Sequence, residues 1–118
     1  MTEPCRVLVL NERDLRHPKA GGAEIHVYEI FSRLVQRGYQ VTHLAASFPG
    51  AASRACVDGI DVRRLGQLAL YYPRAVRTCA RESRAGRFDV VVECLNKVPF
   101  FAPLYAGTPV LAISHHLF

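Results

Sequence analysis

The stretch Asn11–Glu24, NERDLRHPKAGGAE, joins an apolar run to an amphipathic segment and so decides the fold. The apolar run, Val7–Leu10, predicts a buried parallel strand. The segment 23–34 has apolar residues at positions 23, 27, 30, 31 and 34, which is the period of a helix that buries one face. A polar loop therefore leads from the carboxyl end of a strand into the start of a helix.

Gly21 and Gly22 end this loop, directly before the predicted helix. Because they carry no side chain, a ligand could approach the first helical amides, which have no partner inside the helix. Those amides and the helix dipole together attract phosphate or carboxylate groups. Two glycines also suit a tight turn that binds nothing. The length and polarity of the loop favour a binding site over a mere turn.

Length and composition predict one globular domain over residues 1–118, since the chain has 118 residues and half of them are apolar. The opening MTEPCR lacks the apolar segment of a secretory signal, and no apolar run approaches the roughly 20 residues that span a bilayer. The four cysteines form no CxxC pair, which predicts reduced thiols and a cytoplasmic location. The net charge of +5 suits an acidic partner such as phosphate or an anionic membrane face, and we expect no nucleic-acid partner.

The rest of the chain alternates strand and helix patterns. We expect strands over Gln40–Ala45, Ile60–Leu65, Asp89–Glu93 and Pro109–Ser114, a helix over Leu68–Ala85 and a short proline-started helix within Asn96–Tyr105. Ser47–Arg54 is predicted to be a loop. With right-handed crossovers, this order gives an α/β fold, a doubly wound, Rossmann-like parallel sheet of about five strands.

Three polar segments follow the carboxyl ends of predicted strands, namely Asn11–Glu24, Cys94–Lys97 and the pair His115-His116. Ligands of doubly wound sheets bind beyond these ends, so we expect the three segments to meet at one crevice. A histidine at a strand end can contact a substrate, and it can equally pack or face solvent. Glu24 is a candidate base, and equally a favourable partner of the helix dipole.

Several classes of site do not fit the sequence. The glycine loop matches neither the G-x-G-x-x-G fingerprint nor the P-loop, and no acidic residue ends the second strand, which argues against nicotinamide and ATP enzymes. We predict no metal site, because His115 and His116 are strand neighbours that point to opposite faces. A flavodoxin-like phosphate or flavin binder remains a rival hypothesis, although the loop has no serine or threonine.

The predicted helix Leu68–Ala85 has two contrasting faces. One face is lined by Tyr72, Val76, Cys79 and Ser83, and the opposite face by Arg74, Arg77, Arg81 and Arg84. An arginine row of this kind is most often a solvated helix face, and contact with anionic lipid is the alternative.

A series of motifs runs through nearly the whole chain. They are Asn11-x-Arg13-Asp14-x-x-His17-Pro18-x-Ala20-Gly21-Gly22-Ala23-Glu24, Arg37-Gly38-Tyr39-Gln40-Val41-Thr42, Asp58-Gly59, Arg64-Leu65-Gly66, Phe88-Asp89-Val90-Val91, Asn96-x-x-Pro99-Phe100-Phe101 and Ser114-His115-His116-Leu117. In this order they resemble the amino-terminal domain of family-4 glycosyltransferases of the GT-B fold.

The resemblance implies a retaining enzyme that moves a sugar from a nucleotide-sugar donor to an acceptor held mainly by this domain, without a further cofactor. In that family the glycine loop lies against the donor diphosphate, which implies this role for Gly21 and Gly22. A histidine after the last strand faces the donor sugar, which makes His115 and His116 the catalytic candidates. The further candidate substrate-binding residues are Asp14, Glu24 and Asn96.

The second, donor-binding domain of that family has no counterpart in these 118 residues. We therefore expect a carboxyl-terminally truncated domain that is inactive without its donor-binding partner. We also expect it to self-associate through its last strand, which no helix follows. The alternative is a non-catalytic module that binds an anion or a partner chain in the same crevice.

Overall fold

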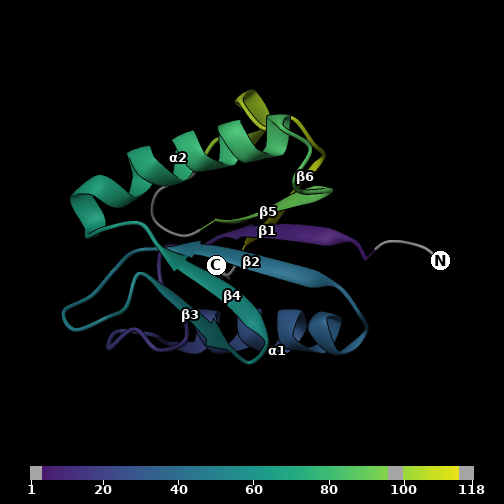
Figure 1. The fold of residues 1–118 in the computed structure, drawn as a ribbon. Coiled ribbons are helices and arrows are strands. Elements are labelled where there is room, and N and C mark those ends of the chain that lie inside the picture. Colours follow the sequence, from purple (N-terminus) through teal and green to yellow (C-terminus); the bar gives the residue numbers. More distant parts are fainter. Residues whose placement is uncertain (1–3, 96–99, 115–118) are drawn as a thin grey trace.

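A computed structural model of the chain describes residues 4–95 and 100–114. Within these residues, six strands and two long helices follow one another in the predicted α/β order (Figure 1). The elements are β1 (Arg6–Leu10), α1 (Gly22–Gln36), β2 (Gln40–Ala45), β3 (Arg54–Val57), β4 (Ile60–Arg64), α2 (Leu68–Arg84), β5 (Val90–Leu95), the 3-10 helix η1 (Ala102–Leu104) and β6 (Val110–Ser114).

All strands belong to one sheet with the order β3-β4-β2-β1-β5-β6. Every neighbouring pair is parallel except β3 and β4. The helices α1 and α2 cover opposite faces of this sheet (Figure 1). The predicted doubly wound, Rossmann-like fold is therefore confirmed.

Strand β3 is the one element that the sequence pattern did not predict. It begins at Arg54, where we expected a loop to end, and it pairs with β4 in an antiparallel hairpin. Asp58 and Gly59 form the two-residue turn, and both have positive φ, 53° and 82°. Such turns match the twist of paired strands. In the part of the chain that the structure describes, the sheet therefore has six strands instead of about five.

The core consists of two apolar layers, one on each side of the sheet. Alternate residues of β1 face opposite ways, so that Val7 and Val9 pack under α1, whereas Leu8 and Leu10 pack under α2. Because both faces are covered, β1 is buried along most of its length. The loop that follows β1 thus starts from a buried interior strand of the sheet.

Helix α2 buries a face slightly rotated from the predicted one. Tyr71, Ala75 and Cys79 are fully buried, whereas Tyr72 and Val76, expected on the buried stripe, are only half-buried. Tyr71 occupies the core because its hydroxyl donates to the carbonyl of Leu44 at 2.6 Å. The four arginines of the opposite face are exposed, as predicted.

Candidate functional site

The loop of residues 11–21 leaves the carboxyl end of β1 and enters α1. Strands β5 and β6 end at the same edge, since β1 and β5, and then β5 and β6, are parallel neighbours. The predicted common edge is therefore confirmed. Asn96, His115 and His116 come after these strand ends in the sequence but lie outside the described residues. Their convergence on the loop stays a prediction.

Short-range hydrogen bonds fold the loop onto itself. The side-chain amide of Asn11 donates to the carbonyl of Arg13 at 2.7 Å. The carboxylate of Asp14 accepts a hydrogen bond from the backbone N–H of Arg16 at 2.8 Å. The backbone carbonyl of Asp14 accepts one from the backbone N–H of His17 at 3.1 Å. Asn and Asp favour turns for this reason. Although it lacks regular structure, the loop thus has a defined shape.

A buried histidine supports the start of the loop from β2. Nε2 of His43 lies 2.8 Å from the carbonyl oxygen of Asn11, and Nδ1 lies 2.7 Å from the hydroxyl of Tyr28. A carbonyl only accepts, so Nε2 carries the proton and Nδ1 accepts from Tyr28. Burial lowers the pKa of His43 to about 4, which keeps the ring neutral near pH 7.

A second buried contact holds the middle of the loop to β4. Asp14 is fully buried, and its Oδ2 lies 2.9 Å from Nε of Arg64, which is also buried. Burial alone would raise the pKa of Asp14, but the hydrogen bonds from Arg64 and from the Arg16 amide outweigh it and lower the pKa. Asp14 was predicted among the substrate-binding residues, but here its carboxylate has no exposed surface and pairs with the protein itself.

Gly21 and Gly22 lie at the exposed start of α1. Gly21 is the N-cap residue and has an extended backbone with φ of −132°. Among residues 4–95 and 100–114, a Cβ on either glycine would meet no atom within 4 Å outside the adjoining backbone, which leaves open space beside them. Glu24, in the first turn, is buried, and its Oε1 accepts from the N–H of Gly21 at 3.1 Å. Glu24 therefore stabilises the helix start, which was one of its two predicted roles.

A pocket of about 400 Å³ lies between this loop and the connection from β2 to β3. We call it the loop pocket. Phe48 is central to its wall, since the guanidinium carbon of Arg64 lies 4.9 Å from its ring centre and the His17 ring packs edge-on at 5.3 Å. The lining residues are Glu12, Arg13, His17, Pro18, Lys19, Ala46, Ser47, Phe48, Pro49 and Gln67.

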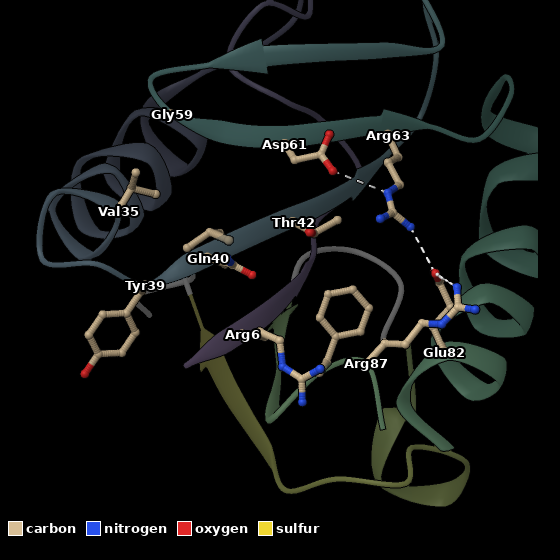
Figure 2. A pocket seen from close by; sticks show the side chains of 12 residues that line it. Arg6, Val35, Tyr39, Gln40, Thr42, Gly59, Asp61, Arg63, Glu82 and Arg87 are labelled. Carbon is tan, nitrogen blue, oxygen red and sulfur yellow. Dashed lines mark hydrogen bonds and ion pairs between the residues drawn. The ribbon is translucent and has the colours of Figure 1, made fainter. Parts of the chain in front are cut away.

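A second pocket, of about 530 Å³, lies at the opposite edge of the sheet, where the strands begin (Figure 2). An ion-pair ladder crosses it from β4 to α2. Arg63 lies 3.5 Å from Asp61 and 3.0 Å from Glu82, which also pairs with Arg87 at 3.2 Å. Ligands of open α/β sheets bind at the other edge. We therefore interpret this ladder as a structural link between the sheet and α2.

The sequence pattern did not identify His43 and Arg64 as parts of the site. A single histidine inside an apolar strand was the available signal, because a buried polar ring needs hydrogen-bond partners. Within residues 4–95 and 100–114, no group of three His, Cys, Asp or Glu residues could hold a metal ion. In the same residues no helix is long and apolar enough to cross a membrane.

Comparison with known proteins gives one match. A model of the family described as Glycosyltransferase Family 4 matches residues 20–118. The match includes Gly21, Gly22 and Glu24, together with the positions of Asn96, His115 and His116. No curated protein and no solved structure shows a significant match to the chain.

Proposed function

The chain belongs to glycosyltransferase family 4, and on this premise we propose that it is the acceptor-side, amino-terminal domain of a retaining GT-B enzyme. This enzyme transfers a sugar from a nucleotide-sugar donor to an acceptor. The role of a second domain follows from the chemistry, since donor and acceptor must be held together while charge builds on the leaving diphosphate. We place the nucleotide-binding residues in that donor-binding domain.

The observation that carries this proposal is the open glycine start of α1 at the carboxyl edge of the sheet. Within the described residues, and apart from the adjoining backbone, no atom lies within 4 Å of the position that a Cβ would take on Gly21 or Gly22. Glu24 takes the Gly21 amide, so a diphosphate would use the next amides of the first turn and the helix dipole. These groups would stabilise the negative charge that develops as the sugar leaves.

The histidines keep the role that the family resemblance implies, and Asn96 keeps its predicted role, whereas Asp14 and Glu24 take positioning roles. His115 or His116 would face the donor sugar, and Asn96 would contact a substrate. Asp14 would act through the loop, because its buried pair with Arg64 holds the backbone on which the glycines lie. Glu24 would position the helix start in the same way.

We test the proposal in a protein that contains this domain together with the donor-binding domain. A panel of nucleotide-sugars identifies the donor, and transfer is then measured for the Gly22→Val and Gly22→Ala variants. A valine would fill the space of the diphosphate, so we expect a loss of transfer of about 100-fold, or about 3 kcal/mol of transition-state stabilisation. A Gly22→Val enzyme with unchanged transfer would contradict the assignment. Pyrophosphate binding without transfer from any donor would favour the non-catalytic module.

The arginine row of α2 suggests a location for the enzyme, at the cytoplasmic face of an anionic membrane. Arg77, Arg81 and Arg84 are exposed, and within the described chain no carboxylate pairs with them. The only acidic residue of α2, Glu82, is buried. A helix face with cations and no anions is attracted to anionic headgroups, at about 1 kcal/mol per arginine near the surface.

A further inference from the structure

We infer that the loop pocket binds the acceptor, and that this acceptor is a hydroxylated ring compound carrying a phosphate or carboxylate group. The inference rests on the proposed transferase function and adds to it the chemical class of the second substrate. It follows from three features of the pocket, which are an unpaired cation, an acceptor-only carboxylate and an apolar wall. Each feature selects one part of the ligand.

The cation is Lys19, at the rim of the pocket. Lys19 is exposed, and among the described residues its ammonium group has neither an ion pair nor a hydrogen bond. The neighbouring Arg13 is already engaged, with Nε 3.3 Å from a carboxylate oxygen of Glu12 and Nη1 donating to the carbonyl of Lys19. Lys19 is thus the charge that remains for an oxyanion, for which lysine is a common partner.

The carboxylate is Glu12, which lines the same pocket and is partly buried. One of its oxygens accepts from the hydroxyl of Tyr72 at 3.1 Å, and the other faces Arg13. A carboxylate has further lone pairs, and it can use them only with a donor such as a ligand hydroxyl. A bare anion would be repelled by Glu12, whereas a hydroxylated anion satisfies both Glu12 and Lys19. Ser47 and Gln67 provide further partners for hydroxyl groups.

The apolar wall is formed by Phe48 with Pro18, Pro49 and Ala46. The C–H face of a sugar or polyol ring packs on such a surface through dispersion and burial of apolar area. Phe48 contacts both Arg64 and His17, so its ring need not be ordered by the ligand. A volume of about 400 Å³ lies in the range of small-molecule pockets and is large enough for one ring compound.

The test measures binding to the purified 118-residue chain without any donor. The probes are glucose 6-phosphate, glucuronate, glucose and inorganic phosphate, titrated by calorimetry and by amide NMR shifts. We expect glucose 6-phosphate or glucuronate to bind at least tenfold more tightly than glucose and inorganic phosphate, with shifts in residues 12–19 and 46–49. The preferred probe tells whether the anionic group is a phosphate or a carboxylate.

Two variants and one control locate the site. Lys19→Gln should weaken binding of the preferred probe about tenfold, which is the effect of losing one charge-assisted contact. Phe48→Leu should weaken it about threefold while leaving the anion preference intact. Arg37→Gln removes the same charge at the far end of α1 and should change nothing.

Absence of binding, equal binding of glucose and glucose 6-phosphate, or equal losses in the Lys19 and Arg37 variants would overturn the inference. The proposed function would be untouched by such a result, because transfer to a neutral acceptor would still be detected in the two-domain assay. Conversely, tight binding of the anionic probes to the chain, without transfer in that assay, would contradict the proposed function and the acceptor role of the ligand, and would leave the loop pocket as a binding site for such compounds.

Discussion

Asp14 and Arg64 lie 50 residues apart in the sequence and form a buried ion pair, with 2.9 Å between Oδ2 and Nε. Arg64 ends β4, and Asp14 lies in the loop that follows β1. The pair therefore fixes the position of the candidate site relative to the sheet. Arg64 also donates to the carbonyl of Ala52 and packs on Phe48. One buried side chain thus organises both loops that form the loop pocket.

Removing one partner of this pair should destabilise the protein strongly. Asp14→Ala leaves the Arg64 guanidinium buried and uncompensated, so we expect a loss of about 3–5 kcal/mol in the free energy of unfolding by urea. The control is Arg54→Ala, which breaks the exposed pair with Asp61 and should cost less than about 1 kcal/mol. Similar losses in both variants would show that the buried pair has no special role.

Stability should fall as the pH is lowered from about 6.5 toward 4. Burial lowers the folded pKa of His43 from 6.5 to about 4, so in this window the unfolded chain binds the additional proton. The resulting loss in the free energy of unfolding amounts to up to about 3 kcal/mol below pH 4. Urea unfolding at a series of pH values measures this loss. The His43→Gln variant should lack this part of the dependence of the free energy of unfolding on pH. Asp14, whose pKa is lowered from 3.8, contributes a separate loss only at lower pH.

Substitution by alanine should affect stability differently at Gly22 and at Gly59. Gly22→Ala should leave stability unchanged or raise it by up to about 1 kcal/mol, because the added methyl group meets open space at a helix start. At Gly59 φ is +82° and a Cβ would lie 2.7 Å from Val35, so Gly59→Ala should destabilise by more than about 1 kcal/mol. Thermal melts of both variants check this. A destabilised Gly22→Ala would mean that this glycine is needed for folding.

The arginine row of α2 should be dispensable for folding. Replacing Arg77, Arg81 and Arg84 together by glutamine should change the free energy of unfolding by less than about 1 kcal/mol, because all three are exposed. Cosedimentation with vesicles should detect binding of the parent chain to phosphatidylserine-containing vesicles, but not to phosphatidylcholine vesicles. The triple variant should lose this binding. Equal binding by both proteins would exclude the row as a membrane contact.

The purified chain should transfer no sugar by itself and should self-associate. Among the described strands, β6 pairs only with β5, and Leu111 on β6 is 57% exposed. An apolar edge strand of this kind pairs readily with another copy. Sedimentation should show dimers or larger species that Leu111→Lys dissociates. A monomer with turnover above that of a Gly22→Val control would contradict both expectations.

Patterns of local sequence were enough to predict the fold class and the strand-to-loop-to-helix unit. Strand β3 was not predicted, because its four residues, Arg54–Val57, are too few for an alternation of apolar and polar residues that would distinguish a strand from a loop. The turn signal at Asp58-Gly59 was recognised, but it pointed only to the strand that follows. On α2, adjacent Tyr71 and Tyr72 are equivalent in a hydropathy pattern, and the hydrogen bond of Tyr71 to Leu44 decides between them.

The position of the candidate site was predictable, but the buried contacts that hold its loop in place were not. Parallel strands bring their carboxyl ends together, so the location of the loop followed from the alternation of strands and helices along the chain. The pairing of Asp14 with Arg64, and of Asn11 with His43, depends on the order β4-β2-β1 in the sheet. Nothing in a linear sequence shows which strand lies beside which. Phe48 and Lys19 line the same pocket for the same reason.

The ion-pair ladder from Asp61 through Arg63 and Glu82 to Arg87 gives α2 two ends of different character. At its start, Tyr71 is anchored in the core, whereas near its end the charged contacts of Glu82 with Arg63 and Arg87 add to the burial of Cys79 and Ser83. Partly exposed ion pairs weaken as salt rises. The pair of Glu82 with the exposed Arg87 should therefore weaken first at high ionic strength, and amide hydrogen exchange in the last turn of α2 should accelerate while the sheet stays protected.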